Sequence, residues 1–335
     1  MKTLLSILFL FTAASSAQWI KQTVNTTANF RGLSVVNQKV IWASGTGGTV
    51  IRTIDGGKGW NVMVVPGAEK LDFRDIEAFD ANTAYILSIG NGESSRIYKT
   101  IDGGATWNLQ FTNKNEKAFF DAIACWDSKN CIAMSDPVDN RFVLVETKDG
   151  TNWSPVDTSR MPATLEGEAA FAASGTCLIV GFRHRIFIVS GGTAARLFGR
   201  DRGIEGEEMP WKVSSSPITK GTAGSGIFSM AIHGDNAVVV GGNYEKPNDT
   251  KDTLAFTNTA GMSWTPGTGL SGYRSGVAYI DDKTIIAVGT NGTDMTTDGG
   301  KTWKKTGGED LNAVATKGKK AVWAVGPKGM VVKLK

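Results

Sequence analysis

Short apolar runs separated by polar turns recur along the whole chain. Three of the turns share the pattern Thr-x-Asp-Gly-Gly-x-x-Trp and end at Trp60, Trp107 and Trp303. Before Trp60 stand three runs of strand length, which are Phe30 to Val36, Val40 to Ser44 and Val50 to Thr53. A turn of this kind repeated at intervals of about 40 to 50 residues predicts a repeated unit of four short strands, with the tryptophan at the start of the fourth.

The aspartate and glycines of each turn suit a tight structural turn rather than a reaction. An aspartate side chain accepts hydrogen bonds from backbone N–H groups two residues ahead, and glycine tolerates positive φ. We therefore interpret Asp55, Asp102, Asp149 and Asp298 as turn-forming residues. The copy around Asp149 is one residue shorter, and the copy that ends at Trp264 lacks the aspartate.

The fourth-strand tryptophans give the number of units. They are Trp60, Trp107, Trp153, Trp211, Trp264 and Trp303. A further three strands lie between Leu311 and Leu334, and the segment from Trp19 to Val24 has the pattern of their missing fourth strand. Pairing these segments closes the ring, whereas six units with loose ends would leave two apolar termini unpaired. The sequence thus predicts an all-β, seven-bladed β-propeller of four-stranded blades, in which the N-terminal strand completes the last blade.

The N-terminus has the pattern of a secretory signal. A lysine, an apolar run from Leu4 to Ala13 and the small residues before Gln18 predict a signal peptide over residues 1–17 and a single propeller domain over 18–335. We expect an exported protein, periplasmic or secreted. No other stretch reaches the length of a transmembrane helix, so no membrane span is expected.

Charge and cysteine content narrow the possible partners. The net charge is +4, and the Lys and Arg residues are scattered without a basic run, which does not indicate nucleic acid binding. Cys125 and Cys131 flank a short turn and could form a cross-strand disulfide or stay as two thiols. Cys177 is expected to be a buried small hydrophobic residue. The chain has only two histidines and no zinc-type spacing, and its glycine-rich turns precede strands, so we predict no metal and no cofactor.

The propeller topology separates two faces. The Asp-box turns join the third and fourth strands of a blade and lie on the face opposite the start of each first strand. Aligning the first strands gives seven equivalent positions, which are Arg31, Arg74, Phe120, Glu168, Phe228, Arg274 and Leu311. The three arginines form one arc, which suits a carboxylate, a phosphate or an acidic protein segment. Solvated charges at strand starts are the alternative interpretation.

The same face carries the least regular loops. The turn between the second and third strands is expected to be long in the third blade, over Ser135 to Arg141, and in the fifth, over Gly241 to Asp249. Such variation on one face of a repeat is typical of binding, although a tolerated insertion would look alike. Asp136, Arg141 and Tyr244 therefore join Glu168 and the three arginines as candidate binding residues.

Several segments carry a resemblance to a known family. Phe73 to Ile76, Ser135 to Phe142, Gly167 to Thr176, Gly224 to Ser229 and Gly241 to Tyr244 resemble bacterial exported Asp-box (BNR-like) propellers related to the photosystem II stability/assembly factor family. The resemblance implies a seven-bladed Asp-box propeller that is a non-catalytic assembly factor. It also implies an arginine patch that holds a protein subunit, a role that maps here onto Arg31, Arg74 and Arg274.

These observations favour a binding scaffold rather than an enzyme. We expect a monomeric, non-catalytic propeller that holds a protein partner on the face opposite the Asp boxes. The alternative is a sialidase-like glycoside hydrolase that uses Asp136 or Glu168 at the mouth of the channel. Sialidases carry an Arg-Ile-Pro motif, whereas Arg31 here precedes Gly32 and Arg74 precedes Asp75.

Overall fold

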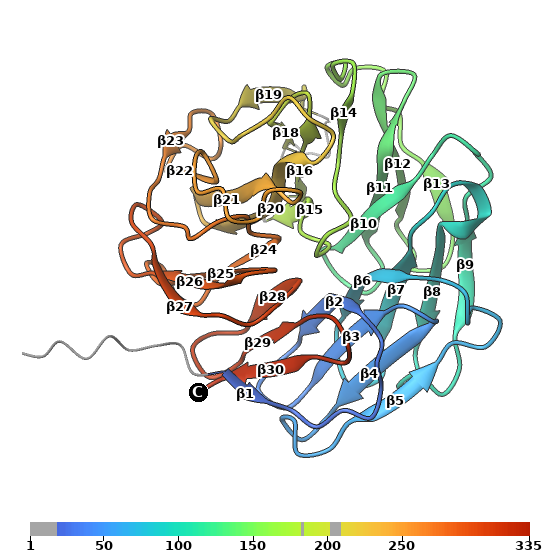
Figure 1. The fold of residues 1–335 in the computed structure, drawn as a ribbon. Coiled ribbons are helices and arrows are strands. Elements are labelled where there is room, and N and C mark those ends of the chain that lie inside the picture. The colour runs from blue at the N-terminus through green and yellow to red at the C-terminus, as the bar shows by residue number, and fades with distance from the viewer. Residues whose placement is uncertain (1–18, 182–183, 202–208) are drawn as a thin grey trace, which may run out of the picture.

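The strands form seven antiparallel sheets arranged as the blades of a ring (Figure 1). The computed structural model describes residues 19–181, 184–201 and 209–335. Six sheets have four strands and one has six. The all-β seven-bladed propeller is confirmed, while the expected signal peptide lies outside the described residues.

The blades follow one another in chain order, and within each blade the chain runs from the innermost strand to the outermost. Blade 1 contains β2 (Phe30–Val35), β3 (Ile41–Gly45), β4 (Thr49–Thr53) and β5 (Asn61–Val64). Blade 2 contains β6 (Phe73–Ala78), β7 (Ala84–Ser88), β8 (Arg96–Thr100) and β9 (Asn108–Thr112), with the short 3-10 helix η1 (Gly92–Ser94) between β7 and β8. Blade 3 contains β10 (Phe120–Cys125), β11 (Cys131–Val138), β12 (Arg141–Thr147) and β13 (Trp153–Pro155).

Blade 4 departs from this plan. It contains β15 (Leu178–Gly181), β16 (Arg185–Val189), β18 (Arg196–Arg200) and β19 (Lys212–Ser215). Blade 5 contains β20 (Ser225–His233), β21 (Asn236–Asn243), β22 (Leu254–Thr257) and β23 (Thr265–Pro266). The two-residue strands β14 (Glu168–Ala169) and β17 (Gly191–Gly192) join the sheet of blade 5 next to β20. The chain of blade 4 therefore reaches into its neighbour.

The last two blades complete the ring. Blade 6 contains β24 (Gly276–Tyr279), β25 (Ile285–Gly289), β26 (Gly292–Thr296) and β27 (Lys304–Gly307). Blade 7 contains β28 (Ala313–Thr316), β29 (Val322–Val325) and β30 (Val331–Leu334), and its outer strand is β1 (Trp19–Lys21) from the other end of the chain. Trp19 pairs with Leu334 in an antiparallel register. This pairing removes the free sheet edges that an open ring would leave.

The tryptophan of the Asp box packs between neighbouring blades. Trp60 contacts Trp323 edge to face with ring centroids 5.7 Å apart, and Trp107 contacts Trp42 in the same way at 6.4 Å. Each partner lies on the second strand of the preceding blade. Edge-to-face pairs add roughly 0.5–1.5 kcal/mol beyond the burial of their area. The repeat thus fixes the spacing between blades as well as the turn.

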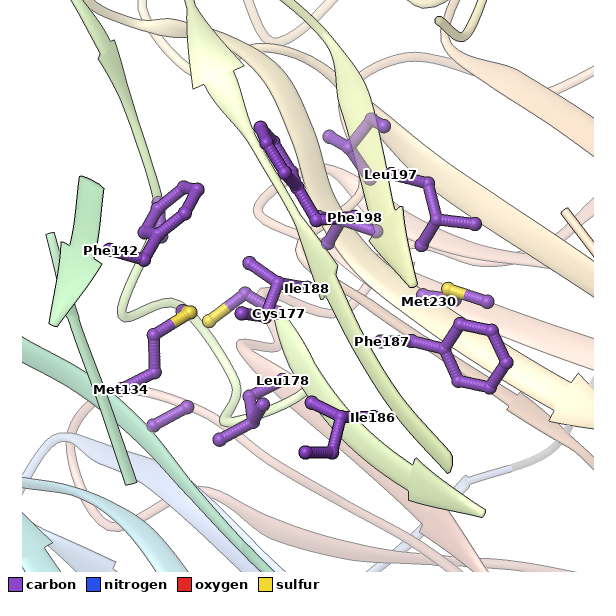
Figure 2. Close-up of a cluster of buried hydrophobic side chains, with 14 of the residues drawn as sticks. Met134, Phe142, Cys177, Leu178, Ile186, Phe187, Ile188, Leu197, Phe198 and Met230 are labelled. Carbon is purple, nitrogen blue, oxygen red and sulfur yellow. The ribbon is translucent and has the colours of Figure 1, made fainter. Parts of the chain in front are cut away.

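The largest buried cluster lies among blades 3, 4 and 5 (Figure 2). Cys177 lies in this cluster with Met134, Leu178 and Ile188, and its side chain is buried, as expected. A disulfide joins Cys125 at the end of β10 to Cys131 at the start of β11, which are direct cross-strand partners. Among the described residues, no helix is both long enough and apolar enough to cross a membrane.

Candidate functional site

The first strand of several blades contains a β-bulge at the same place. The cross-strand register skips one residue in blades 1, 2, 3 and 5, and the skipped residues are Arg31, Arg74, Asp121 and Phe228. A bulge re-aims the side chain of the extra residue. These four residues therefore share one structural position at the entrance to the channel.

In blade 4 the same place holds a whole segment instead of one extra residue. β14 pairs with β17 up to the partners Ala169 and Gly191, and the ladder resumes between Leu178 of β15 and Ile188 of β16. Residues 170–176, here called the axial segment, leave the ladder between these points. Figure 1 shows the chain running from β14 toward the middle of the ring before it enters β15.

The axial segment is held by side chains from many blades. Phe171 stacks on Phe228 of blade 5 with ring centroids 3.8 Å apart. Ser174 donates a hydrogen bond of 2.7 Å to the Ser275 carbonyl next to blade 6, and the backbone N–H of Ala170 donates one of 2.7 Å to the Asp136 carboxylate of blade 3. The channel entrance is thus occupied by the protein's own chain rather than left open.

Arg31 and Arg74 are brought together, as the sequence predicts, but they point at the axial segment. Nη1 of Arg31 donates to the Ala173 carbonyl at 3.2 Å, and Nη1 of Arg74 donates to the Ala172 carbonyl at 3.3 Å. Arg74 also forms an ion pair with Asp72 at 2.8 Å. Burial, and after it the charge of Arg74, lower the pKa of Arg31 from its usual range.

Arg274 does not belong to this arc, so its place in the predicted alignment is wrong. Its side chain is fully buried in an ion pair with Asp294, with Nε 2.6 Å from the carboxylate. The equivalent of Arg31 in blade 6 is the next residue, Ser275. The backbone N–H of Ser275 donates a hydrogen bond to the Val288 carbonyl, and Val288 is also the cross-strand partner of Gly276 in β24, so Ser275 is the extra residue at this place. A shift of one residue along a strand turns the side chain to the other face of the sheet.

Glu168 and Phe120 are also displaced from their predicted positions. Glu168 lies in β14, not at the start of the first strand of blade 4, and its buried carboxylate is paired with Arg196 and accepts a hydrogen bond from Ser190. In blade 3 Phe120 packs in the core and Asp121 takes the bulge position. The Phe120 error comes from the bulge, which an alignment that counts residues does not detect, and the Glu168 error comes from the axial segment, which separates β14 from β15.

A cleft of about 500 Å³ opens beside the axial segment. Its walls come from blades 2 and 3, from β14 and from the axial segment, and they include Arg74, Lys117, Phe119, Asp121, Asp136 and Phe171. Asp136 thus reaches the site that the sequence predicts for it. Arg141 begins β12 and Tyr244 follows β21, where 49% of its surface is exposed. The Tyr244 ring contacts Phe228 edge to face at 6.2 Å.

Asp121 is the functional candidate that the sequence reasoning missed. Its side chain is buried, it lines the cleft, and its Oδ2 has no hydrogen-bond partner. Burial and the neighbouring Asp136 raise the pKa of Asp121 well above its usual range, and burial raises that of Asp136 to about 6. A signal for Asp121 is present in the sequence. The pair Phe120-Asp121 corresponds to Phe30-Arg31 and Phe73-Arg74, so the residue after the phenylalanine is the equivalent position.

The Asp-box aspartates complete their own turns on the opposite face. Oδ1 of Asp102 accepts hydrogen bonds from the Thr106 N–H at 2.9 Å and the Thr100 hydroxyl at 2.8 Å. Bonds from Thr106 lower the pKa of Asp102 to about 2. Asp55, Asp149 and Asp298 accept bonds in the same way. In the copy without an aspartate, the Thr259 hydroxyl accepts the equivalent bond from the Ser263 N–H.

Over the part of the chain that the structure covers, no group of three His, Cys, Asp or Glu side chains could hold a metal ion. Asp121 and Asp136 are the two acidic groups of the cleft whose carboxylates have no cationic partner in the contacts above, since Asp72 and Glu168 are paired with arginines. The site can therefore accept hydrogen bonds and positive charge.

Of the comparisons with known proteins, the one with solved structures bears on the fold. No family model matches this sequence, and no curated protein matches it. Among solved structures the chain is similar to YCF48 bound to a D1 peptide, with 17% identity and a TM-score of 0.67 over 97% of this chain and 99% of that one. It is also similar to YCF48 from Cyanidioschyzon merolae, with 16% identity and a TM-score of 0.68 over 95% of this chain and 99% of that one.

A third likeness is more general. The WD40 β-propeller domain of Doa1 matches with 11% identity and a TM-score of 0.63, over 97% of this chain and 98% of that domain. At such identities these matches show the propeller architecture. The resemblance to the photosystem II assembly factor family that the sequence predicts is thus confirmed as a likeness to the YCF48 propeller over nearly the full chain.

Proposed function

We propose that this chain is a non-catalytic binding scaffold that holds a protein partner on the face opposite the Asp-box turns. The observation that carries the proposal is the cleft beside the axial segment, which is the place where the blade pattern breaks. On the other face the aspartates are already engaged by their own turns. Variable features on one face of a repeat are where binding usually occurs.

The likeness to YCF48 supports a protein segment as the ligand. YCF48 has been solved bound to a D1 peptide, so a propeller of this architecture can hold a peptide. We extend only this general capacity to the present chain.

The structure alters the roles within the proposed site. Arg31 and Arg74 bind carbonyl groups of the axial segment, so we assign them to holding this segment and shaping the cleft. Direct contact with the partner then depends on other side chains of the same face, above all the exposed Tyr244 and Lys117 and the half-buried Arg141. Tyrosine and arginine are enriched among residues that dominate binding energy.

Site-specific photo-crosslinking in the host cell tests this proposal. A photoreactive amino acid replaces Tyr244 in one variant and Ile101 in another. Ile101 lies in an Asp-box turn and is 65% exposed, so it is a matched control on the opposite face. We expect a discrete protein adduct from position 244 and none from position 101. Adducts from position 101 alone would place the partner on the wrong face and overturn the proposal.

The hydrolase alternative loses one of its two candidate carboxylates. Glu168 is buried and paired with Arg196, and it is therefore tied to the protein rather than presented to a substrate. Glycoside hydrolysis needs a pair of carboxyl groups on either side of the scissile bond. Asp121, the other carboxyl group beside Asp136 in the cleft, is itself almost fully buried, and we propose no catalytic role for this chain.

We also propose that the protein works outside the cytoplasm. The disulfide between Cys125 and Cys131 supports this, because disulfides persist in oxidising compartments. Mass spectrometry of the protein from fractionated cells tests it, and the expected product begins at Gln18 and carries the disulfide. A cytoplasmic product that retains residues 1–17 would contradict it.

A further inference from the structure

The charges around the cleft do not balance. Asp72 is paired with Arg74, and Glu168 is paired with Arg196. Asp121 and Asp136 form no ion pair of their own. The charge of Arg74 and the backbone N–H groups of Asp136 and Ala172 favour the ionised form of Asp121, but burial and the charge of Asp136 outweigh them. The other basic residue of the cleft wall, Lys117, is exposed to solvent. A buried carboxyl group without a cation or enough hydrogen bonds is costly.

Asp121 shows this deficit most directly. Its side chain is 1% exposed, its Oδ2 has no hydrogen-bond partner, and it lines the cleft. Buried polar atoms are nearly always paired, so an unpaired one that faces a cavity indicates a missing partner. A cation meets this need, because its charge favours the ionised carboxylate and its N–H groups donate to the oxygens, which in the ionised form only accept hydrogen bonds.

The rest of the cleft suits a long aliphatic stem. Phe119, Pro137 and Phe171 contribute apolar surface to its wall, and all three are half-buried. Lysine and arginine bury their methylene groups along such surface while the charged end seeks a polar partner. The apolar surface of this cleft therefore matches the aliphatic stem of a basic side chain, and the two carboxyl groups match its charged end.

We propose that this cleft receives the side chain of a lysine or arginine from the protein segment that the scaffold binds, with the cation against Asp121 and Asp136. The inference rests on the proposed function and adds the chemistry of one contact. A cation placed here supplies the donors that Asp121 lacks. It also favours ionisation of the two carboxyl groups, whose pKa values are raised in the empty cleft.

Small analogues of the basic side chains test the inference without knowledge of the partner. Saturation-transfer NMR titrations compare n-butylguanidinium and n-butylammonium with n-butylurea, which keeps the shape of the guanidinium compound but has no charge. We expect saturable binding of the two cations and at least about tenfold weaker binding of the urea, because a charge-assisted bond to a desolvated carboxylate is lost. Equal binding of n-butylurea by the wild-type protein would overturn the inference.

Variants of the folded full chain identify the site. Asp121→Asn and Asp136→Asn are each expected to weaken n-butylguanidinium binding by at least about tenfold. Asp139→Asn is the matched control, since Asp139 is an exposed aspartate at the tip of the same β11–β12 hairpin. Thermal unfolding confirms folding of each variant, and the wild-type comparison of charged and neutral analogues decides the question even if one variant fails to fold. Unchanged binding in both Asn variants would show that the cations bind elsewhere.

This result is separable from the proposed function. If crosslinking from position 244 captures a partner while the cations do not bind the cleft, the scaffold proposal stands and the proposed contact with a basic side chain is wrong. If the cations bind the cleft but no partner is captured, the cation site stands, while the scaffold proposal and with it the protein source of the basic side chain are overturned.

Discussion

The two faces of the propeller are built on different principles. On the Asp-box face each turn satisfies itself, because the bonds of Asp102 reach residues only two and four positions away. On the opposite face the important contacts span the chain, and Arg31 binds a carbonyl 142 residues away. Local contacts form wherever the motif occurs, whereas the cleft exists only when blades 1 to 6 and the axial segment are assembled. The repeat therefore supplies a regular frame, and the irregular blade 4 supplies the site.

Arg274 gives the largest expected effect on this comparison. It looks equivalent to Arg31 in sequence, but its guanidinium is fully buried against Asp294. Arg274→Ala leaves that carboxylate buried without its cation, so we expect the free energy of unfolding to fall by about 3–5 kcal/mol. Denaturant unfolding with Arg31→Ala as the matched control measures the difference. A loss no larger than that of the control would show that Arg274 is not a structural ion pair.

The stability contributions of Asp75, which is buried in blade 2, and of Asp102, which lies in an Asp-box turn, should depend on pH with opposite signs. Burial raises the pKa of Asp75 in β6 from 3.8 to about 7, although it accepts bonds from the backbone N–H groups of Ile123 and Ile76. Between these values the folded protein holds a proton that the unfolded chain has released. The contribution of Asp75 to stability is therefore complete below about pH 4 and is lost as the pH rises through about 7.

For Asp102 the sign is reversed. Its folded pKa is lowered to about 2, so its contribution is present above about pH 4 and is lost as the pH falls toward 2. Unfolding measured from about pH 2 to 8 tests both, with Asp75→Asn and Asp102→Asn compared with the wild type. We expect the Asp75→Asn difference to change by on the order of 2–4 kcal/mol between about pH 4 and 7. A flat difference over that range would show that Asp75 titrates normally.

The sequence predicts the fold well because its signals are local. The box pattern, the six tryptophans and the apolar termini suffice for seven blades closed by β1. It predicts the site only in part, because bulges change which face a residue occupies without changing the spacing of apolar positions. Arg31, Arg74 and Asp136 reach the expected face, while Arg274 and Phe120 are one residue from the position that matters.

The position of the axial segment could not be predicted from the sequence, for a further reason. Its residues are mostly small, and alanines and serines carry no periodicity that predicts where they pack. What fixes them is a set of distant partners, such as Phe228 for Phe171 and Ser275 for Ser174. The sequence therefore places Glu168 wrongly at the start of the first strand of blade 4, whereas Glu168 begins β14 and that strand is β15.

Removing the two arginines that hold the axial segment should have an intermediate effect. The double variant Arg31→Met, Arg74→Met keeps most of the aliphatic stems but loses the bonds to the Ala173 and Ala172 carbonyls. We expect a loss of about 1–3 kcal/mol. Hydrogen exchange should become faster in residues 170–176 and stay unchanged in the Asp-box turns. Unchanged exchange in the axial segment would mean that its other contacts suffice to hold it.

The smallest expected effect comes from one Asp box. Asp102→Ala removes the bonds from Thr106 and Thr100, but the turn is exposed and its strands β8 and β9 remain paired. We expect the melting temperature to fall by at most about a few degrees. Hydrogen exchange should become faster only between Ile101 and Thr106, with no change in the axial segment or in n-butylguanidinium binding. If the cleft loses affinity as well, the two faces are coupled through the blade, and the separation between a self-contained frame and an assembled site does not hold.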